Sequence, residues 1–522
     1  MLSGYDIFLP VVWLLVAAGI VLLIDLFSED ADRQAMPVFF TALGGVLLSF
    51  VSLNPYWDAR PVLVMRGAML IDQFAAYLTT AILIGTAVSM FASISYVRRI
   101  GISFTDFCCT LLLAATGMVL LVVSNDLIML FLSIELLSFS VYVLTGLRGN
   151  SSKSAEGAMK YFVMGALASG VMVMGMAALY GVTGEVALRP LGDQLVEIFR
   201  NSPDASGGDA RYMATLGMGS VLIAFAFKVG AVPFHSWVPD AYEGAPTTVT
   251  GFMAVAVKAA AFGALIRIAV TVFPDVPMHG QFSGNFGWAT YALWALSAMS
   301  MILGNWFAIS QRNIKRMLAY SSIAHSGYLL MGLAAAGGRT EAYAAVLFYL
   351  LTYTLMTSGA FAMLVYASSH GKDVEEIDDL RGLAWKKPAV GICLAIFMFS
   401  LAGIPLTGGF MGKYFVFSQA VYAGGPFLSL AIIGIGTSIV GSYYYLRVVA
   451  VTYFKEADDK PVHGREDWGI KFAISVTVFG TVALGVFPQM FYDGAKASVK
   501  QLREEAPVVV TAPAKTAAMI EK

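Results

Sequence analysis

The sequence predicts an all-α protein that crosses a membrane about fourteen times. Its 522 residues are 58% hydrophobic and only 13% charged, with a mean hydropathy of +0.74, whereas soluble domains carry about 25% charged residues. The apolar residues also fall into separate runs of roughly 20, the length that an α-helix needs to cross a bilayer. A soluble globular fold is therefore excluded.

The predicted spans follow from these apolar runs, taken in order along the chain. They cover residues 7–27, 36–53, 69–96, 105–123, 126–147, 156–181, 214–234, 247–273, 288–309, 314–336, 341–369, 388–423, 425–454 and 470–490. The first run has no basic segment before it and is too long for the apolar region of a signal peptide, so we expect it to be a transmembrane helix.

Charge and cysteine content exclude further classes. The formal net charge is −1, from 33 basic and 34 acidic residues, so no nucleic-acid partner is expected. Cys108, Cys109 and Cys393 have neither an even count nor a metal-ligand spacing. A disulfide framework, a zinc ribbon and an iron–sulfur site are thus unsupported.

The basic residues of the connections predict the orientation, because Lys and Arg are enriched in cytoplasmic loops. With the N-terminus outside, the cytoplasmic connections hold 17 of them: Arg33, Arg98, Arg99, Arg148, Lys153, Lys160, Arg312, Lys315, Arg316, Lys372, Arg381, Lys386, Lys387, Lys455, Lys460, Arg465 and Lys471. The external connections hold 6: Arg60, Arg66, Arg189, Arg200, Arg211 and Arg339. Both termini are therefore predicted to face outward.

Two spans are interrupted by proline. The segment 388–422 would be about 50 Å long as one helix, against a hydrocarbon core of about 30 Å, and Pro405 divides it. The seventh span likewise ends at Pro233. A proline removes one helical hydrogen bond and frees the carbonyl four residues earlier, here those of Val229 and Leu401. Open backbone at membrane depth is tolerated only inside protein or beside water, so both breaks predict a polar interior.

The two breaks also look alike. VGAVPF at 229–234 aligns with LAGIPL at 401–406, and a lysine lies near each, Lys228 before the first and Lys413 after the second. Opposite placement of the lysine is what an inverted repeat produces.

Four ionisable residues lie near the middle of apolar segments: Glu135, Lys228, Lys258 and Lys413. A charge at the bilayer centre costs roughly 2.5–3.5 kcal/mol even on lenient insertion scales, so such a residue suggests a function. The function that these residue types favour is the movement of charge. Four others fall near predicted helix ends, where a solvated or structural role is expected: Asp72, Asp126, Arg267 and Arg447.

Several sequence blocks resemble one known family. They are SIELLSF at 133–139, FKVGAVPFHSWVPDAYEGAPTTVTGFM at 227–253, QRNIKRMLAYSSIAHSGY at 311–328 and GIPLTGGFMGK at 403–413. Together they resemble the antiporter-like membrane subunits of respiratory complex I over nearly the whole chain, and YEGAP is similar to the subunit N type. Lys413 argues against the M type, which usually has glutamate there, and the short tail after Met490 argues against the L type.

The resemblance implies fourteen helices, with helices 4–8 and 9–13 forming two inverted five-helix repeats in which helices 7 and 12 are broken. The corresponding regions are 1–100 for the first three helices, 101–273 and 288–454 for the repeats, and 470–522 for the last helix and tail.

The resemblance also implies roles for individual residues. Glu135 and Lys228 resemble the family's carboxylate–lysine pair, and Lys258 resembles its central lysine. Lys413 resembles the terminal proton carrier, and His325 resembles a polar bridge between the repeats. His235, after Pro233, is either a further relay member or a hydrogen-bond partner that stabilises its loop, and the spacing of His235, Asp240 and Glu243 fits no known metal site.

A lysine beside a movable carboxylate suits proton transfer. Burial lowers a lysine's pKa and a nearby carboxylate raises it, so movement of Glu135 relative to Lys228 would switch the lysine between holding and releasing a proton. A pKa change of one to two units corresponds to about 1.4–2.7 kcal/mol. The work of moving a proton across a membrane is similar, about 2.3 kcal/mol per 100 mV.

The resemblance implies a subunit of a proton-translocating NADH:quinone oxidoreductase in the bacterial inner membrane, beside subunit M and the small K and J subunits. The chain shows no flavin, haem, iron–sulfur or quinone signature, so NADH, FMN, iron–sulfur clusters and quinone are expected in partner subunits. Two alternatives stay open. A subunit of a multisubunit cation/proton antiporter would share the lysines and broken helices, whereas a scaffold would tolerate apolar residues in place of the buried charges.

Overall fold

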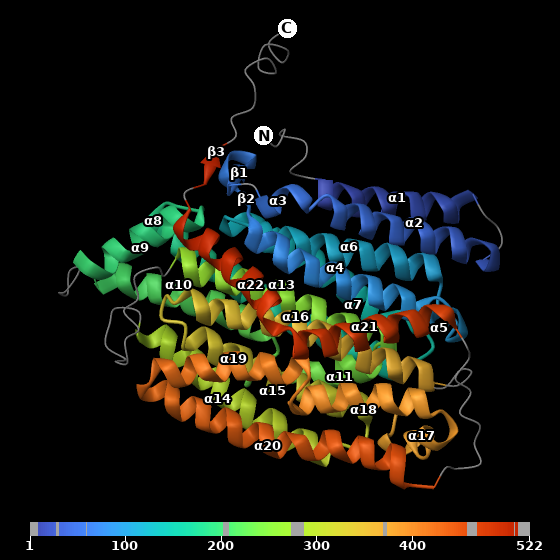
Figure 1. Cartoon of the computed structure of the whole chain (residues 1–522). Coiled ribbons are helices and arrows are strands. Elements are labelled where there is room, and N and C mark those ends of the chain that lie inside the picture. The colour runs from blue at the N-terminus through green and yellow to red at the C-terminus, as the bar shows by residue number, and fades with distance from the viewer. Residues whose placement is uncertain are drawn as a thin grey trace.

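The structure, a computed structural model, is a bundle of long helices that lie side by side (Figure 1). It describes residues 9–27, 31–58, 60–201, 208–272, 287–368, 373–456, 467–505 and 507–509. Some predicted positions lie outside the described residues. They are residues 7, 8, 273 and 369, at the ends of predicted spans, and the tail from 510 onward. The predicted all-α membrane fold is confirmed.

The first part of the chain runs from the N-terminal helices to the end of the seventh predicted span. Its elements are α1 (Leu9–Phe27), α2 (Ala31–Val51), α3 (Asn54–Asp58), β1 (Val62–Val64), η2 (Met65–Gly67), β2 (Met69–Ile71), α4 (Gln73–Ser93), α5 (Tyr96–Arg99), α6 (Phe104–Val123), α7 (Leu127–Gly146), α8 (Ser152–Thr183), α9 (Leu188–Asn201) and α10 (Gly208–Lys228).

The second part begins after the first break. Its elements are α11 (Trp237–Gly244), α12 (Thr247–Phe252), the π-helical turn η3 (Met253–Val257), α13 (Lys258–Thr271), α14 (Gly287–Ser310), α15 (Ile314–Ala334), α16 (Thr340–Ala367), η4 (Ile377–Leu380), α17 (Leu383–Lys386), α18 (Pro388–Ala402), α19 (Gly408–Ala423), α20 (Gly425–Phe454), α21 (Trp468–Val486), α22 (Pro488–Glu504) and β3 (Val508–Val509).

Twelve of the described helices are long and apolar enough to cross a membrane, and each coincides with a predicted span. The other two predicted spans are also helical. One is α15, whose first turn carries Lys315 and Arg316. The other is the pair α18 and α19, which have 15 and 16 residues and are therefore too short to cross singly. The division into two half-helices predicted from Pro405 is confirmed.

Three predicted boundaries are wrong. The span predicted at 214–234 stops at Lys228, because the chain leaves the helix ahead of Pro233. The span predicted at 69–96 includes a strand, β2, and its helix begins only after Asp72, whose side chain caps it by accepting a hydrogen bond from the N–H of Ala75 at 2.7 Å. The span predicted at 470–490 ends at Val486, and Pro488 starts a new helix.

Two longer helices, several short ones and a small sheet were not predicted. The helices α9 and α22 have 14 and 17 residues and are amphipathic, so a search for long apolar runs passes over them. In the sheet, of order β2-β1-β3, β1 pairs antiparallel with β2 (Val62 opposite Ile71) and parallel with β3 (Val62 opposite Val508). It ties the connection after α3 to the end of the described chain.

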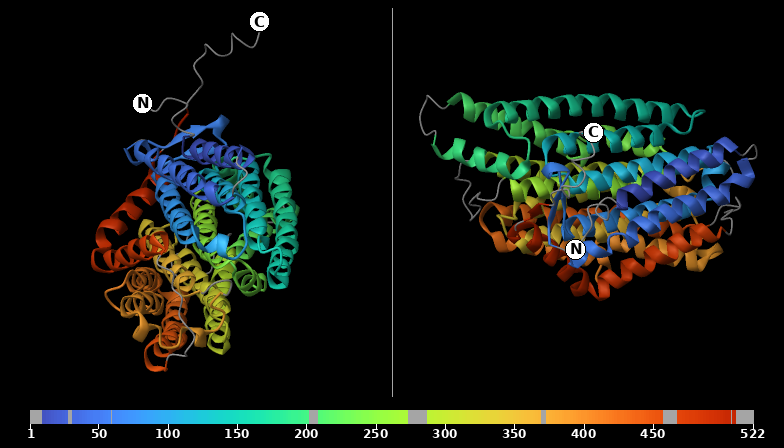
Figure 2. Two further views of the ribbon diagram at one scale, coloured as in Figure 1. Left: turned by 90° about the vertical axis from the view of Figure 1, so that its right-hand side faces the viewer. Right: turned by 90° about the horizontal axis from the view of Figure 1, so that it is seen from above.

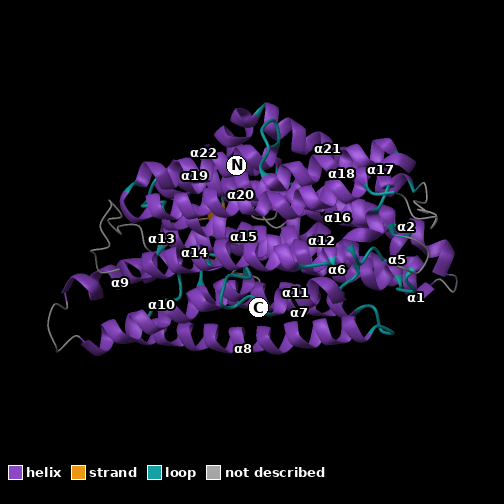
Figure 3. Cartoon of the chain, turned by 90° about the horizontal axis from the view of Figure 1, so that it is seen from below, coloured by secondary structure: helices purple, strands orange, loops and turns teal. Residues whose placement is uncertain are grey.

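The core of the bundle is α16, whose membrane-spanning segment is buried throughout. It contacts helices from both ends of the chain: α4, α12, α15, α18, α19, α21 and α22. Figure 2, left, views the bundle nearly along its helices, with the blue N-terminal helices on one side and the orange helices on the other. Seen from below in Figure 3, α8 forms one edge of the bundle.

Connections predicted to share a membrane face do lie together. Arg148 after α7 pairs with Asp373 after α16 at 2.9 Å, and Lys455 after α20 pairs with Asp378 at 2.8 Å. At the other face Arg339 before α16 donates to the carbonyl oxygen of Gln419 near the end of α19 at 3.0 Å. The alternation of the predicted loops is thus consistent with the structure, and which face is cytoplasmic stays a prediction, as does the division into inverted repeats.

Candidate functional site

The first break lies directly after Lys228, between α10 and α11. The predicted free carbonyl, that of Val229, accepts a hydrogen bond from Ser326 Oγ of α15 at 2.6 Å. Val232 N–H donates to Ser300 Oγ of α14 at 2.9 Å. The open backbone of the first predicted repeat is therefore held by hydroxyl groups from the second.

The second break, between α18 and α19, is held by a lysine. Gly403 has a φ of +89°, which ends α18 in the left-handed conformation that glycine adopts readily. Lys413 Nζ then donates to the carbonyl oxygens of Leu401 and Ala402, each at 2.9 Å, and to Ser438 Oγ of α20 at 2.9 Å. The side chain of Lys413 thus extends across the break and donates a hydrogen bond to the Leu401 carbonyl, which Pro405 leaves without a helical partner.

Lys228, at the end of α10, is 5% exposed and contacts α7. Its Nζ donates to Ser138 Oγ at 2.6 Å and to the hydroxyl of Tyr142 at 3.4 Å. Glu135 lies one turn before Ser138 on the same helix and accepts a hydrogen bond from Ser169 Oγ of α8. Among the ion pairs of the described residues there is none between Glu135 and Lys228. The predicted pair occupies neighbouring positions, with a serine in contact with the lysine.

Lys258 begins α13, directly after the π-helical turn η3. Such turns are often found at functional sites. Its side chain is 4% exposed, and its Nζ donates to the carbonyl oxygen and to the Oγ of Ser322 on α15, both at 2.6 Å. The ring of Tyr353 from α16 lies 4.9 Å from Nζ, within the range of a cation–π contact.

His325 lies between these lysine sites on α15. It is 1% exposed, and its two ring nitrogens contact the hydroxyls of Tyr349, at 2.6 Å, and Tyr445, at 3.1 Å. Ser322, His325 and Tyr328 follow one another at three-residue spacing, so they lie along one side of α15. Since Ser322 contacts Lys258 and the ring of Tyr328 covers Lys413 at 5.3 Å, α15 joins the central and terminal lysines.

His235 is not brought into this arrangement. It is half-buried in the segment between α10 and α11, and its buried Nδ1 has no hydrogen-bond partner among the described residues. Asp240 and Glu243 of α11 both bind Arg316, at 2.6 and 2.9 Å. A search of the described residues finds no cluster of three or more His, Cys, Asp or Glu that would hold a metal ion.

The other predicted ionisable residues have structural contacts. Arg267 on α13 makes two hydrogen bonds to the carboxylate of Asp72, at 2.9 and 3.1 Å, and both side chains are almost fully buried. Asp126 caps α7 by accepting from the N–H of Met129 at 2.6 Å, and Arg447 contacts the carbonyl oxygen of Gln311. The structural role expected for these residues agrees with these contacts.

Comparisons with known proteins decide the family. A sequence profile described as NADH:quinone oxidoreductase/Mrp antiporter, TM matches residues 124–439. NADH-quinone oxidoreductase subunit N of Trichlorobacter lovleyi is 35% identical over 500 residues, which cover 95% of this chain and 97% of that protein. Subunit N 1 of Rhizobium meliloti is 39% identical over 487 residues, covering 93% and 96%. The chain belongs to the NADH-quinone oxidoreductase subunit N family.

Two solved structures have a similar fold. A chain of respiratory complex I from Thermus thermophilus, solved with bound Aureothin, superposes with a TM-score of 0.75 at 31% identity, covering 93% of this chain and 98% of that one. A chain of the Mrp complex from Dietzia sp. superposes with a TM-score of 0.79 at 21% identity, covering 96% and 98%. The second likeness shows the fold alone, and the resemblance inferred from the sequence blocks is confirmed.

The sequence did not point to the residues that contact the lysines in this subunit N family member. These residues are Ser138, Ser322 and Ser438, and each lies on a long apolar helix that carries other hydroxyl side chains as well. A serine two or three residues from a predicted functional residue, as Ser138 and Ser322 are, is the only sequence signal that would have suggested them.

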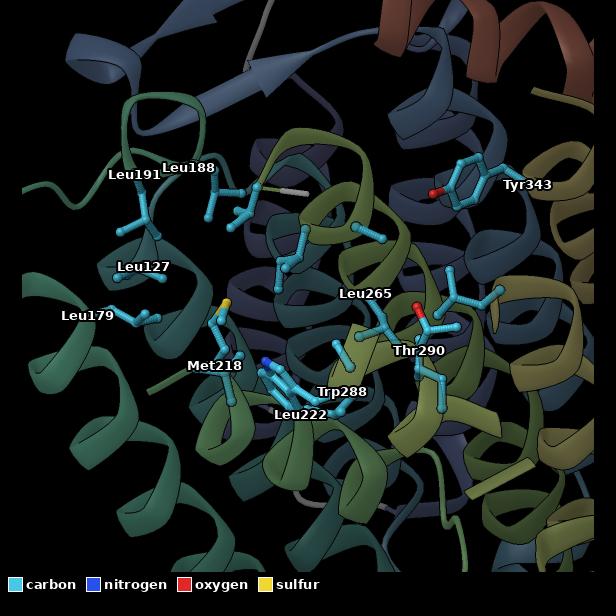
Figure 4. Close-up of a pocket in the computed structure, with 17 residues that line it drawn as sticks. Leu127, Leu179, Leu188, Leu191, Met218, Leu222, Leu265, Trp288, Thr290 and Tyr343 are labelled. Carbon is cyan, nitrogen blue, oxygen red and sulfur yellow. The ribbon is translucent and has the colours of Figure 1, made fainter. Parts of the chain in front are cut away.

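An apolar pocket lies elsewhere in the molecule (Figure 4). It is lined by side chains from α7 to α10 and from α13 to α16, among them Leu127, Leu188, Met218 and Trp288. None of Glu135 and the three lysines lines it. Lys228, Lys258, His325 and Lys413 instead lie buried in the packed interior of the bundle, and Glu135 is partly buried.

Proposed function

We propose that this chain translocates protons in the membrane arm of an NADH:quinone oxidoreductase, through Glu135, Lys228, Lys258, His325 and Lys413. The observation that carries the proposal is the absence of a carboxylate partner. None of the ion pairs among the described residues includes any of the three lysines. A buried amine whose direct contacts are all neutral favours an easily exchanged proton, because no ion pair holds it in the charged form. Glu135 acts on Lys228 through its charge, without an ion pair between these two described residues.

The buried Arg267 provides a contrast within the same helix bundle. It is always charged, and it is matched by the carboxylate of Asp72 with two hydrogen bonds. This buried cation has a carboxylate that compensates its charge. Lys258, on the same helix as Arg267, has only the oxygens of Ser322 and the ring of Tyr353.

The proposed route runs from cytoplasmic water to Lys228 and Lys258, then through His325 to Lys413 and outward. Contacts along α15 support this order, because Ser322, His325 and Tyr328 connect the neighbourhoods of Lys258 and Lys413. His235 is proposed as a further member at the cytoplasmic side, and its position after the first break supports that role.

Electron transfer is assigned to partner subunits, with NADH, FMN, iron–sulfur clusters and quinone bound there. The relatives are named as subunits of NADH-quinone oxidoreductase, and we propose subunit M and the small K and J subunits as the neighbours of this chain in the bacterial inner membrane. The chain would then contribute to the enzyme as its translocating part.

The test uses Glu135→Ala and Lys228→Ala in the assembled complex. We expect both to reduce proton uptake into membrane vesicles strongly and to reduce coupled quinone reduction, while electron transfer from NADH to an artificial acceptor continues. Lys500→Ala, at an exposed lysine of α22, is the matched control. Normal pumping by both variants, at normal assembly on native gels, would rule this pair out.

A further inference from the structure

Three of the four buried lysines among the described residues have the same two kinds of neighbour, a serine hydroxyl and a tyrosine ring; the fourth, Lys315, donates to the carbonyl oxygen of Ala245 instead. The sets are Lys228 with Ser138 and Tyr142, Lys258 with Ser322 and Tyr353, and Lys413 with Ser438 and Tyr328. In this order the Nζ–Oγ distances are 2.6, 2.6 and 2.9 Å, and the distances from Nζ to the ring centroids are 5.6, 4.9 and 5.3 Å. The arrangement recurs although the three serines come from α7, α15 and α20.

A serine hydroxyl differs from the other groups that contact these amines in one chemical respect. An ammonium carries three N–H donors and no acceptor, whereas a neutral amine carries two donors and one acceptor lone pair. A backbone carbonyl or an ionised carboxylate only accepts hydrogen bonds. It can therefore pair with the third N–H of the ammonium but not with the lone pair that replaces this N–H in the neutral amine. A hydroxyl both accepts and donates, and it rotates to suit its partner.

The geometry at Lys413 allows this exchange of partners. The ammonium has three acceptors, the carbonyl oxygens of Leu401 and Ala402 and Ser438 Oγ, all at 2.9 Å. When the proton leaves for the next acceptor along the route, the two remaining N–H groups stay on the carbonyls. The lone pair that is left then accepts the hydroxyl hydrogen of Ser438. The amine remains fully hydrogen-bonded in both forms without moving.

We propose that Ser138, Ser322 and Ser438 are positioning residues that hold each lysine in one place in both its charged and its neutral form. A carboxylate at these positions would hold the lysine in its charged form, because it carries a negative charge and only accepts hydrogen bonds. The inference rests on the proposed function, because it concerns lysines that gain and lose a proton.

The structure predicts different costs for removing each hydroxyl. Without the Ser138 hydroxyl, Lys228 keeps only the hydroxyl of Tyr142, at 3.4 Å. Without the Ser322 hydroxyl, Lys258 keeps the Ser322 carbonyl oxygen, and without that of Ser438, Lys413 keeps two carbonyls. The alanine variant at position 138 is therefore expected to be the most impaired of the three.

The decisive comparison is Ser438→Thr against Ser438→Val in the assembled complex. Threonine and valine have nearly the same shape and differ in the hydroxyl, and Ser438 is only partly buried, which leaves room for a methyl group. We expect the threonine variant to pump protons as the unaltered protein does. The valine variant should pump about tenfold more slowly, the lower end of what one hydrogen bond to a charged group is worth.

The same comparison at Ser138, with Ser138→Thr against Ser138→Ala, decides the matter if the valine variant does not assemble, since alanine cannot overfill the site. Proton uptake into vesicles and NADH-driven quinone reduction are measured together, with assembly checked on native gels. Equal pumping by the hydroxyl-bearing and hydroxyl-free variants would overturn the proposal. If the serine variants pump equally while Lys413→Arg and Lys228→Ala abolish pumping, only the role of the serines is overturned. The proposed function of the lysines then stands.

Discussion

Replacement of Lys413 by arginine or by methionine separates the proton-carrying role of this lysine from its structural one. Its Nζ holds the carbonyl oxygens of Leu401 and Ala402 at the second break, each at 2.9 Å. Methionine keeps much of the length but supplies no donor. Each buried carbonyl left without a partner costs about 1–3 kcal/mol, so Lys413→Met should destabilise the break by about 2–6 kcal/mol.

Arginine retains the structural function and loses the chemical one. Its guanidinium carries five N–H donors and a permanent positive charge, so it is expected to occupy the two carbonyls and preserve assembly. In water arginine gives up its proton at least about two pH units above lysine, which makes the deprotonated form about 100-fold rarer or more. Proton release from position 413 should fall by a similar factor.

The assay is proton uptake into vesicles alongside quinone reduction, with thermal stability and assembly measured on the same preparations. Lys413→Arg should assemble normally and pump poorly, whereas Lys413→Met should be impaired in both. Lys500→Arg is the control for the same substitution at an exposed site. Full pumping by an assembled Lys413→Arg variant would show that this lysine need not deprotonate, and the proton route would have to end at another residue.

Three further predictions follow from the topology and the buried contacts. Reporter fusions within 372–386 should read as cytoplasmic, and an external reading there would reverse the predicted orientation. Asp72→Asn leaves Arg267 uncompensated and should lower stability in detergent by about 3–5 kcal/mol, most of it recovered when Arg267→Gln is added; a double variant no better than the single one would contradict the pairing. Ser326→Ala removes the donor to the Val229 carbonyl and should cost about 1–3 kcal/mol, and unchanged thermal stability would show that this hydrogen bond is dispensable.

Local chemistry made much of the fold predictable from the sequence. Apolar runs predict the membrane helices because a bilayer offers no hydrogen-bond partner for open backbone. Pro233 and Pro405 predict the breaks because a proline disrupts the helical turn that precedes it. The same reasoning does not predict elements that are only a few residues long. The strands β1, β2 and β3 have only three, three and two residues, and they exist because they meet one another in space.

The candidate site likewise has a part that could be predicted from the sequence and a part that could not. Residue types and positions in the apolar runs were enough to predict which residues carry charge inside the bundle and which carbonyls, those of Val229 and Leu401, lose their helical partners. The groups that contact them became known from the packing of the helices: Ser326 contacts Val229 from 97 residues away, and Asp72 pairs with Arg267 across 195 residues. A side chain's type and its position in a helix are local properties, but the partner of a buried polar group is chosen by the packing of helices that the sequence separates widely.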